Sequence, residues 1–422
     1  MLRRVTLTEP YRRAVSKNLL QWYVLRQKIE IETMKFKYLL ILILLATACD
    51  SQENVLYHFD PRTIEEKIIT LSEFADDITY VLLDNKFPIS LIYSPRYFID
   101  SSIYISALNS GVMVFDRNGK FIRKIGSIGR GPGEYVYYFN FTVDENSESV
   151  YVMSSSHGII KVYSKNGTFM RDISLKEIGD GADIIKAFNS YLFVSFHPQF
   201  ENVKYDWIIL DTLGKVVSIR NRTNPMFTSN WLIGGGVYDY DNNIYSWNPF
   251  VDTVFSIQHD LMYKPSFLIS PGDYRLPKSQ IDMGEISTYL NLYRILETNR
   301  FLIFYYGFDS KLTITLIDKK SKESFSTNLQ SGPATVGTNL IGGIYNDLDG
   351  GVKFQPESYF VEDGREYLVG LVNAYQVKAL LTNKEFQTSI PAYPEKKQKL
   401  KNLANNLTET DNQIFMIVRL KN

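Results

Sequence analysis

A glycine cluster is the first group of residues in this sequence whose spacing could do chemistry. Four glycines and one proline fall within residues 126–134 of the stretch IGSIGRGPGEYVYYFNF. Glycine-rich loops bind phosphate through backbone amides when they open a helix, as in Gly-Lys-Ser/Thr or G-x-G-x-x-G. Here Pro132 interrupts the glycines, and the aromatic strand pattern EYVYYFNF follows. The pattern therefore favours a backbone corner between two sheets over a nucleotide site.

Two polar clusters carry the oxygen ligands that a divalent cation prefers. They are the Asp-Asn-Asn run at 241–243 and the pair Asp347 and Asp349. Both lie in segments that are predicted to form turns, where Asp and Asn are common because they suit the backbone conformation of a turn. Ile244 also stands where a calcium loop of the EF type needs glycine. We therefore expect no cofactor, with calcium or another divalent cation as the alternative.

The histidines give no pattern of a catalytic site. No H-x-x-x-H and no G-x-S-x-G occurs in the sequence. A Ser-His-Asp triad assembles in space rather than in sequence, so its presence stays open at this point. Ordinary surface or core positions are expected for all four histidines, His58, His157, His197 and His259.

The single cysteine, Cys49, follows the stretch MKFKYLLILILLATA. Two lysines and an uninterrupted apolar run at 39–45 precede the small residues 46–48, which a signal peptidase needs. The apolar run is about half of the ~20 residues that span a bilayer. The stretch resembles a bacterial lipoprotein signal, although Ala46 stands where that signal usually has leucine. The resemblance implies that Cys49 is lipidated.

The charge of the chain is divided between its two ends. Residues 1–48 hold nine of the 46 Lys and Arg and three of the 46 Asp and Glu, which leaves 37 bases and 43 acids beyond them. A mildly acidic body argues against nucleic acid as a partner, because binding to phosphates needs a basic face.

The elements that must position these residues repeat along the chain. VFDRNGKFIRKIG at 114–126 and VYSKNGTFMRDIS at 162–174 align at a shift of 48, and ILDTLGKVVSIR places Gly214 another 47 residues on. Each copy alternates apolar residues around a tight turn, which predicts a β-hairpin. LIGG recurs at 232–235 and 340–343, and each copy leads into a predicted turn and strand, YDYDNNIYSW and NDLDGGVKF.

Repeats of four short strands indicate a β-propeller. Six hairpins can be placed, so the fold class is all-β, a six-bladed propeller of four-stranded antiparallel blades. An insertion is expected at 271–291 and one short helix at 394–408, which begins with a proline. The last strand, 413–420, is expected to close the ring by joining a blade begun near 55–70.

Four elements together resemble the six-bladed β-propeller lipoproteins of anaerobic Gram-negative bacteria, which are similar to NHL-repeat propellers. These elements are LSEFADDITYVLLDN, GRGPGEY, the Asn-Gly hairpins and the terminal IFMIVRLKN. The resemblance covers residues 54–422 and implies an envelope lipoprotein, but it implies no common activity. The predicted organisation is a mis-assigned or disordered leader at 1–33, a signal peptide at 34–48, a lipidated tether at 49–53 and the propeller at 54–422.

Four side chains are candidates for ligand contact. Arg130 and Glu134 lie in a connection of the kind that lines one end of a propeller channel, unless they form a salt bridge that pins the corner. Trp231 and Trp247 could stack on a ligand or pack in the core.

We expect a non-catalytic platform, lipid-anchored in the outer membrane, that binds a protein, peptide or glycan. The alternative is a divalent-metal-dependent hydrolase or lactonase acting on a sugar derivative, and a third possibility is a structural subunit of an envelope assembly.

Overall fold

The computed structural model describes residues 57–421, except 90, 137–139, 155–157, 180, 198–203, 223–233, 270–273, 278–281, 283 and 332–339. Of residues 1–56 it describes Lys28 alone. The predicted leader, signal peptide and tether, with Cys49, therefore lie outside the described residues.

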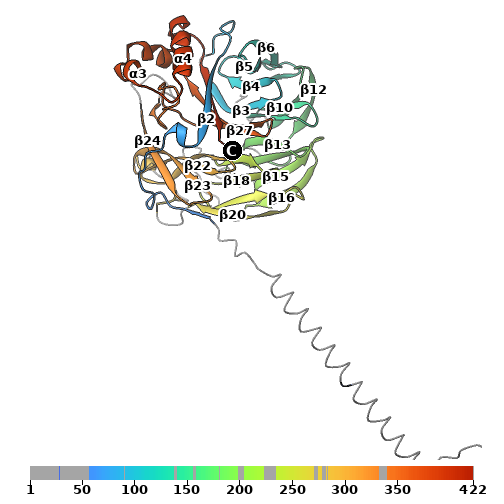
Figure 1. The fold of residues 1–422 in the computed structure, drawn as a ribbon. Helices are drawn as coiled ribbons and strands as arrows, with labels where there is room; N and C mark the ends of the chain where they lie inside the picture. Colours follow the sequence, from blue (N-terminus) through green and yellow to red (C-terminus); the bar gives the residue numbers. More distant parts are fainter. Residues whose placement is uncertain are drawn as a thin grey trace, which may run out of the picture. The chain divides into compact units, whose positions relative to one another are not determined.

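The described residues form six blades around a central axis, and the inner strand of each blade faces that axis (Figure 1). Blade 1 contains β3 (Ile92–Ile99), β4 (Ser102–Ala107), β5 (Gly111–Asp116) and β6 (Phe121–Ile125). Blade 2 contains β9 (Asn140–Asp144), β10 (Ser149–Ser154), β11 (Ile159–Ser164) and β12 (Phe169–Ser174). Blade 3 contains β13 (Ala182–Phe188), β14 (Tyr191–Phe196), β15 (Tyr205–Asp211) and β16 (Val216–Asn221).

Two of the other three blades take a strand from the N-terminal part of the chain, and blade 5 carries a fifth strand that follows its own fourth. Blade 4 contains β17 (Gly236–Tyr240), β18 (Asn243–Trp247), β19 (Thr253–Ile257), β20 (Tyr263–Ile269) and the short β1 (Tyr57–Phe59). Blade 5 contains β21 (Asn291–Glu297), β22 (Phe301–Phe308), β23 (Lys311–Asp318), β24 (Ser324–Ser331) and β25 (Leu340–Gly342). Blade 6 contains β26 (Ser358–Glu362), β27 (Arg365–Val372), β28 (Ile414–Leu420) and β2 (Ala75–Leu82). The predicted fold class is confirmed.

The repeated hairpins join the two outer strands of blades 1, 2 and 3. Their turn glycines, Gly119, Gly167 and Gly214, have φ angles of 84°, 88° and 93°, which side chains rarely adopt. In two of these turns an aspartate, Asp116 or Asp211, accepts hydrogen bonds of 2.9 Å from the amides two and four residues on. The same local chemistry therefore builds the same corner repeatedly.

The ring is closed by an N-terminal strand that pairs with the C-terminal one. β2 runs antiparallel to β28, from Ala75 opposite Leu420 to Leu82 opposite Ile414. Blade 6 thus takes three strands from the end of the chain and its outer strand from near the start, so opening the ring would require breaking a strand pair.

The partner predicted for the last strand was wrong. Within 55–70 the structure places β1, which adds in parallel to the outer edge of blade 4. The chain then passes blade 5, where Lys67 pairs with Glu323 at 3.4 Å and Glu66 accepts a hydrogen bond from Asn328 at 2.9 Å. A strand of three residues gives almost no alternation, so the sequence could not show that closure falls to the next strand, β2.

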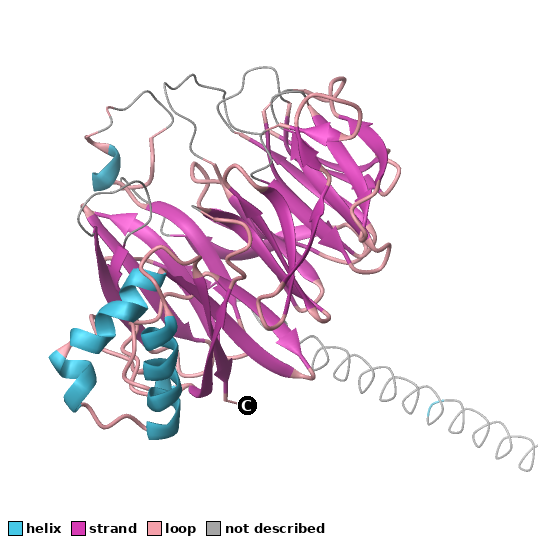
Figure 2. Cartoon of the chain, turned by 90° about the horizontal axis from the view of Figure 1, so that it is seen from above, coloured by secondary structure: helices cyan, strands magenta, loops and turns pink. Residues whose placement is uncertain are grey.

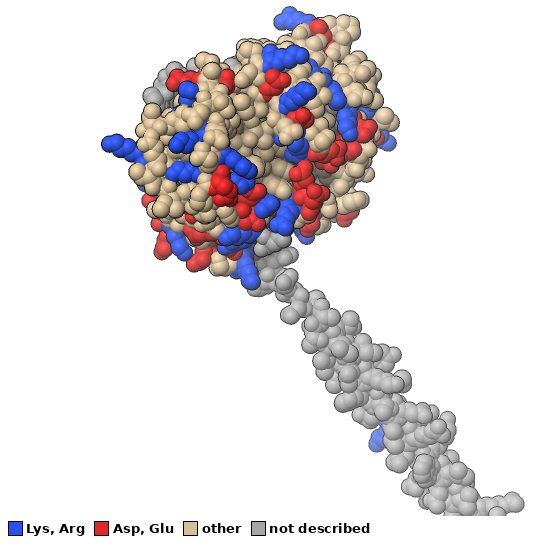
Figure 3. All heavy atoms as spheres, turned by 45° about the horizontal axis from the view of Figure 1, so that its top comes forward, with Lys and Arg blue, Asp and Glu red and all other residues tan. Residues whose placement is uncertain are grey.

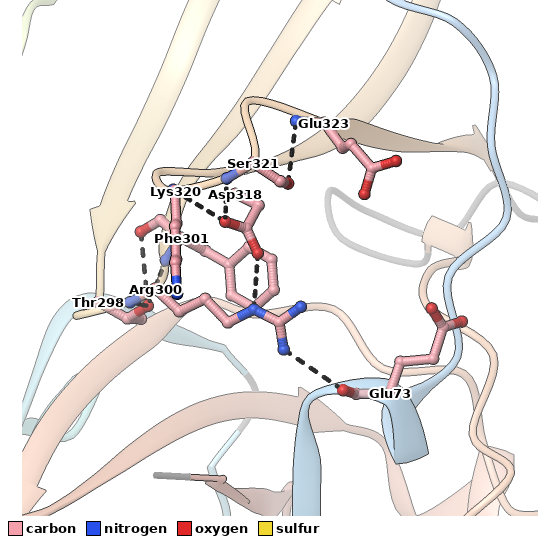
Figure 4. Close-up of polar contacts among 8 residues, drawn as sticks. All are labelled: Glu73, Thr298, Arg300, Phe301, Asp318, Lys320, Ser321 and Glu323. Carbon is pink, nitrogen blue, oxygen red and sulfur yellow. Dashed lines mark hydrogen bonds and ion pairs between the residues drawn. The ribbon is translucent and has the colours of Figure 1, made fainter.

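A polar cluster fixes the N-terminal segment to blade 5 just before β2 (Figure 4). Arg300 donates to Asp318 at 2.7 Å and, through a second nitrogen, to the carbonyl oxygen of Glu73 at 3.4 Å. Burial raises the pKa of Asp318, but the bonds from Arg300 and from the amides of Ser321 and Lys320 outweigh it, so the pKa is lowered. Stacking of Arg300 on Phe301, at 4.7 Å, completes the contact.

The core between blades is largely aromatic, as the period-two pattern predicts. Phe98 of blade 1 stacks on Phe360 of blade 6 with ring centroids 4.8 Å apart. On the other side of the same strand, Tyr97 meets Phe141 of blade 2 edge-on at 5.3 Å. Successive side chains of one inner strand therefore hold the neighbouring blades on both sides.

A helical insert separates β27 from β28 along the chain. Its helices gather at one side of the propeller (Figure 2). The insert contains α2 (Ala374–Ala379), η4 (Leu380–Thr382), α3 (Lys384–Thr388) and α4 (Pro394–Asn406). The prediction at 394–408 matches α4, which begins with its proline. The shorter helices escaped prediction because single turns carry little periodicity and depend on tertiary packing. Within the described part of the chain, no helix is long and apolar enough to cross a bilayer.

The predicted correspondence of the two LIGG units holds only in part. YDYDNNIYSW forms the hairpin β17–β18, with Asp241 and Asn242 at positive φ. NDLDGGVKF forms a turn without a strand of its own, and the inner strand of blade 6 begins later, at Ser358. Asp349 is fully buried there and accepts hydrogen bonds from Asn346 and from the amide of Gly351, so the segment packs as a loop.

The hairpin turn of blade 1 gives a test of how the ring closes. A Cβ at Gly119 would lie 2.0 Å from the carbonyl oxygen of Leu82 at the end of β2, whereas one at Gly364 would meet nothing within 4 Å. Both glycines have positive φ. We expect Gly364→Ala to reduce the free energy of unfolding by about 1 kcal/mol and Gly119→Ala by about 3 kcal/mol. Urea unfolding measures both, and equal losses would contradict a tight contact between blades 1 and 6.

Candidate functional site

The corner with the pattern GRGPGEY joins blade 1 to blade 2, as predicted. Its two halves pair as short parallel strands, β7 (Ser127–Ile128) and β8 (Glu134–Tyr135). The carboxylate of Glu134 folds back onto the corner and accepts a hydrogen bond from the amide of Gly131 at 2.7 Å. A Cβ at Gly129 would lie 2.0 Å from that carboxylate. Two of the glycines therefore make room for Glu134.

Tyr135 makes this corner part of the core. Its ring is 1% exposed, and its hydroxyl donates to the carbonyl of Ile125 at 2.7 Å and accepts from the amide of Val112 at 3.0 Å. Arg130 is exposed. Among the described residues, the carboxylate of Glu134 bonds to Ser127 and to the amide of Gly131, and no ion pair joins it to Arg130. A ligand role of Arg130 stays a prediction, while the salt bridge between the two is not formed.

The two tryptophans fall in different situations. Trp247 is 5% exposed, and its ring lies flat against Gly236, where a Cβ would come within 1.8 Å. It packs beside Tyr238 in the core formed by blades 4 and 5. Trp231 lies outside the described residues.

A cavity of about 820 Å³ opens at one end of the channel. We call it the channel mouth. Turns between the first two strands of five blades border it, and the inner strands form its walls. The bordering turn residues are Glu145, Asn189, Asp241, Asn242, Asn299 and Gly364. On the surface drawn in Figure 3, basic and acidic side chains are intermingled.

The charged groups of the channel mouth are largely paired. Lys186 contacts Asp239 of the next blade at 2.6 Å and lies over the ring of Tyr97 at 4.9 Å. Burial lowers the pKa of Lys186, but Asp239 outweighs it, so this pKa is raised and the ammonium stays charged. The pair therefore presents a fixed dipole to a ligand rather than a free charge.

Two carboxylates of the channel mouth accept hydrogen bonds from tyrosine hydroxyls. Tyr238 donates to Glu297 at 2.8 Å, and Tyr359 donates to Glu366 at 2.6 Å. Burial and the neighbouring carboxylate raise the pKa of Tyr238 well above its usual value, so its hydroxyl remains a donor. Tyr293, which is 48% exposed, offers a ring that can stack on a ligand.

Sequence reasoning missed these residues, although the sequence holds a signal for them. Arg96, Lys186 and Arg294 are each the single basic residue of a strand that is mostly apolar or aromatic, in IYSPRYFI, ADIIKAF and NLYRILE. A lone base inside a strand is costly to bury, so it indicates a wall that faces water or a partner. Only the order of strands shows that all three belong to inner strands.

The residues considered above as metal ligands or catalysts do not come together in one site. Asp347 is bound by Ser72, through its amide at 2.8 Å and through its hydroxyl. No group of three His, Cys, Asp or Glu that could hold a metal occurs among the described residues. His197 pairs with Asp183 at 3.3 Å, His58 and His259 are exposed, and His157 lies outside the described residues.

Substitutions at this corner test whether Tyr135 has a structural role. Tyr135→Phe removes two buried hydrogen bonds, so we expect it to lower the free energy of unfolding by about 1–3 kcal/mol. Tyr263→Phe, at a ring 42% exposed, is the matched control and should change it by less than about 0.5 kcal/mol, as should Arg130→Ala. Urea unfolding compares the three. A Tyr135→Phe variant as stable as the control would contradict the structural role.

Comparison with known proteins supports the fold. The chain is similar to a Bacteroides fragilis protein described as a candidate exported protein, with 17% identity, a TM-score of 0.62 and coverage of 86% of this chain and 99% of that one. It is also similar to a member of the duf4221 family from Bacteroides vulgatus, with 13% identity, a TM-score of 0.48 and coverage of 82% and 98%. No curated protein matches. Residues 57–419 match the family described as a domain of unknown function (DUF4934), and the chain therefore belongs to that family.

Proposed function

We propose that this protein is an envelope lipoprotein whose propeller binds a protein, peptide or glycan at the channel mouth. The observation that carries the proposal is the cavity of about 820 Å³ where turns of five blades converge. Such a cavity offers a ligand paired charges, tyrosine hydroxyls and an exposed ring within one rigid frame. The wall is held by hydrogen bonds within and between blades, so binding would order few side chains.

The proposed location rests on the sequence around Cys49 and on the similar protein described as exported. A diacylglycerol on this cysteine, with a further acyl chain, would hold the propeller at the outer membrane without a spanning helix. The propeller would then be tethered by the residues between Cys49 and β1.

Site-directed photo-crosslinking tests the binding face. Val361, 54% exposed, lines the channel mouth, and Val217, 42% exposed, lies on the outer strand of blade 3. With a photoreactive amino acid at one position or the other in living cells, we expect adducts from position 361 and not from 217. The mass and chemistry of the adduct distinguish a protein, peptide or glycan. Adducts from 217 alone, or from neither position, would count against the channel mouth.

Removal of the thiol tests the tether. Cys49→Ala should abolish lipid attachment and move the protein from the detergent phase to the aqueous phase in a Triton X-114 partition. Cys49→Ser is the matched control and should behave in the same way, because the sulfur itself is the acceptor. Unchanged partition of both variants would show that Cys49 is not the anchor.

A further inference from the structure

A second cavity, of about 850 Å³, lies between the helical insert and the channel. We call it the insert pocket. Its walls come from the start of β3, the loop at 342–355, blade 6 and the helices α2 and α3. It shares only Arg96 and Glu357 with the channel mouth, so these two residues stand where the cavities meet.

Arg96 has a guanidinium whose donors are mostly unused. Its side chain is only 5% exposed. Nη1 pairs with a carboxylate oxygen of Glu357 at 2.7 Å, whereas Nε is buried and has no hydrogen-bond acceptor. The remaining nitrogen reaches the carbonyl of Ile92 only at 3.5 Å. A buried guanidinium with unused donors is rare in folded proteins, and it indicates a binding partner.

The charge at this position favours an anion. Arg294, on the neighbouring inner strand β21, acts with burial to lower the pKa of Arg96, while Glu357 opposes them. Among the described residues, Glu357 is the one carboxylate that pairs with Arg96, and the nearby guanidinium of Arg294 adds a second positive charge to this part of the channel. A carboxylate placed on the unused donors of Arg96 would satisfy both the hydrogen bonds and the charge.

The rest of the insert pocket is suited to an apolar body. Ile341 is 54% exposed, Tyr375 39% and Tyr345 36%, so three large side chains leave apolar surface uncovered around one cavity. Leu371 and Val372 of blade 6 line the same cavity. Tyr345 donates to Glu385 of α3 at 3.3 Å, which joins the loop to the insert across the pocket.

We propose that the insert pocket binds a small organic acid, with its apolar body against the tyrosines and its carboxylate on Arg96. The insert pocket shares Arg96 and Glu357 with the channel mouth but has an apolar wall of its own, so its test does not depend on the proposed function. The volume suits a molecule of ordinary metabolite size, since ligand pockets run from about 300 to 1,000 Å³.

Calorimetric titration of the purified full chain tests the proposal. The probes are phenylacetate, 4-hydroxyphenylacetate and hexanoate, each beside its neutral amide. We expect each acid to bind at least about tenfold more tightly than its amide, because only the acid forms a charge-assisted pair with Arg96. In Arg96→Gln the acid should lose this advantage and bind like the amide.

Two further variants separate binding from folding. Arg294→Gln is the matched control, because Arg294 does not line the insert pocket. It should keep at least part of the preference for the acid. Tyr375→Ala, on the exposed side of α2, should weaken acid and amide by a similar factor and leave their ratio unchanged. The thermal unfolding midpoint of each variant confirms that it is folded.

Three results would overturn the proposal. The first is that none of the acids binds more tightly than its amide. The second is that a folded Arg96→Gln protein keeps the preference for acids. The third is that inorganic phosphate or sulfate binds through Arg96 as tightly as the acids, with no effect of Tyr375→Ala, because the pocket would then recognise an anion without an apolar body.

Discussion

The pairing of β2 with β28 is the interaction on which the rest of this structure depends, because it joins the two ends of the ring. Each blade packs only on its two neighbours, so an open ring would leave a face of one blade exposed to water. Here seven residues of the last strand pair with a strand that begins at Ala75. The contact of Arg300 with Asp318 and Glu73 holds the approach to that strand. Closure therefore uses both main-chain pairing and a side-chain anchor.

A closed ring turns the inner strands into the walls of a channel, and this explains where the polar residues lie. The blade cores are apolar and aromatic, and they can accept few charges. Lys186 and Glu297 lie on inner strands, where a charge can meet a partner from the neighbouring blade or strand. Arg96 departs from this rule, because its carboxylate partner leaves most of its donors unused. The carboxylates Asp239, Glu297 and Glu366 of the channel mouth have partners, whereas Nε of Arg96, where the channel meets the insert pocket, has none.

The helical insert makes this propeller different from a plain ring of hairpins. It enters between two adjacent strands of blade 6 without breaking their pairing, since β27 and β28 remain in register. Leu400, Ala404 and Phe386 of the insert join the core formed by blades 5 and 6. One side of the insert is therefore structural, while the side with Tyr375 borders a cavity. A rigid wall added in this way can shape a binding site at little cost to the fold.

The blades follow from local sequence patterns, since hairpins, aromatic alternation and the proline that begins α4 have local causes. The sequence also showed that the glycines at 126–134 turn a corner. The sequence did not show which strand closes the ring or where the first strand of blade 6 begins. It also did not show which charged residues of the inner strands lie together in the channel. Those depend on contacts between residues far apart in the chain, such as Arg96 with Glu357 or Lys186 with Asp239. These contacts are visible only in the folded chain, because the alternation of a strand shows which of its faces is buried but not which residues pack against that face.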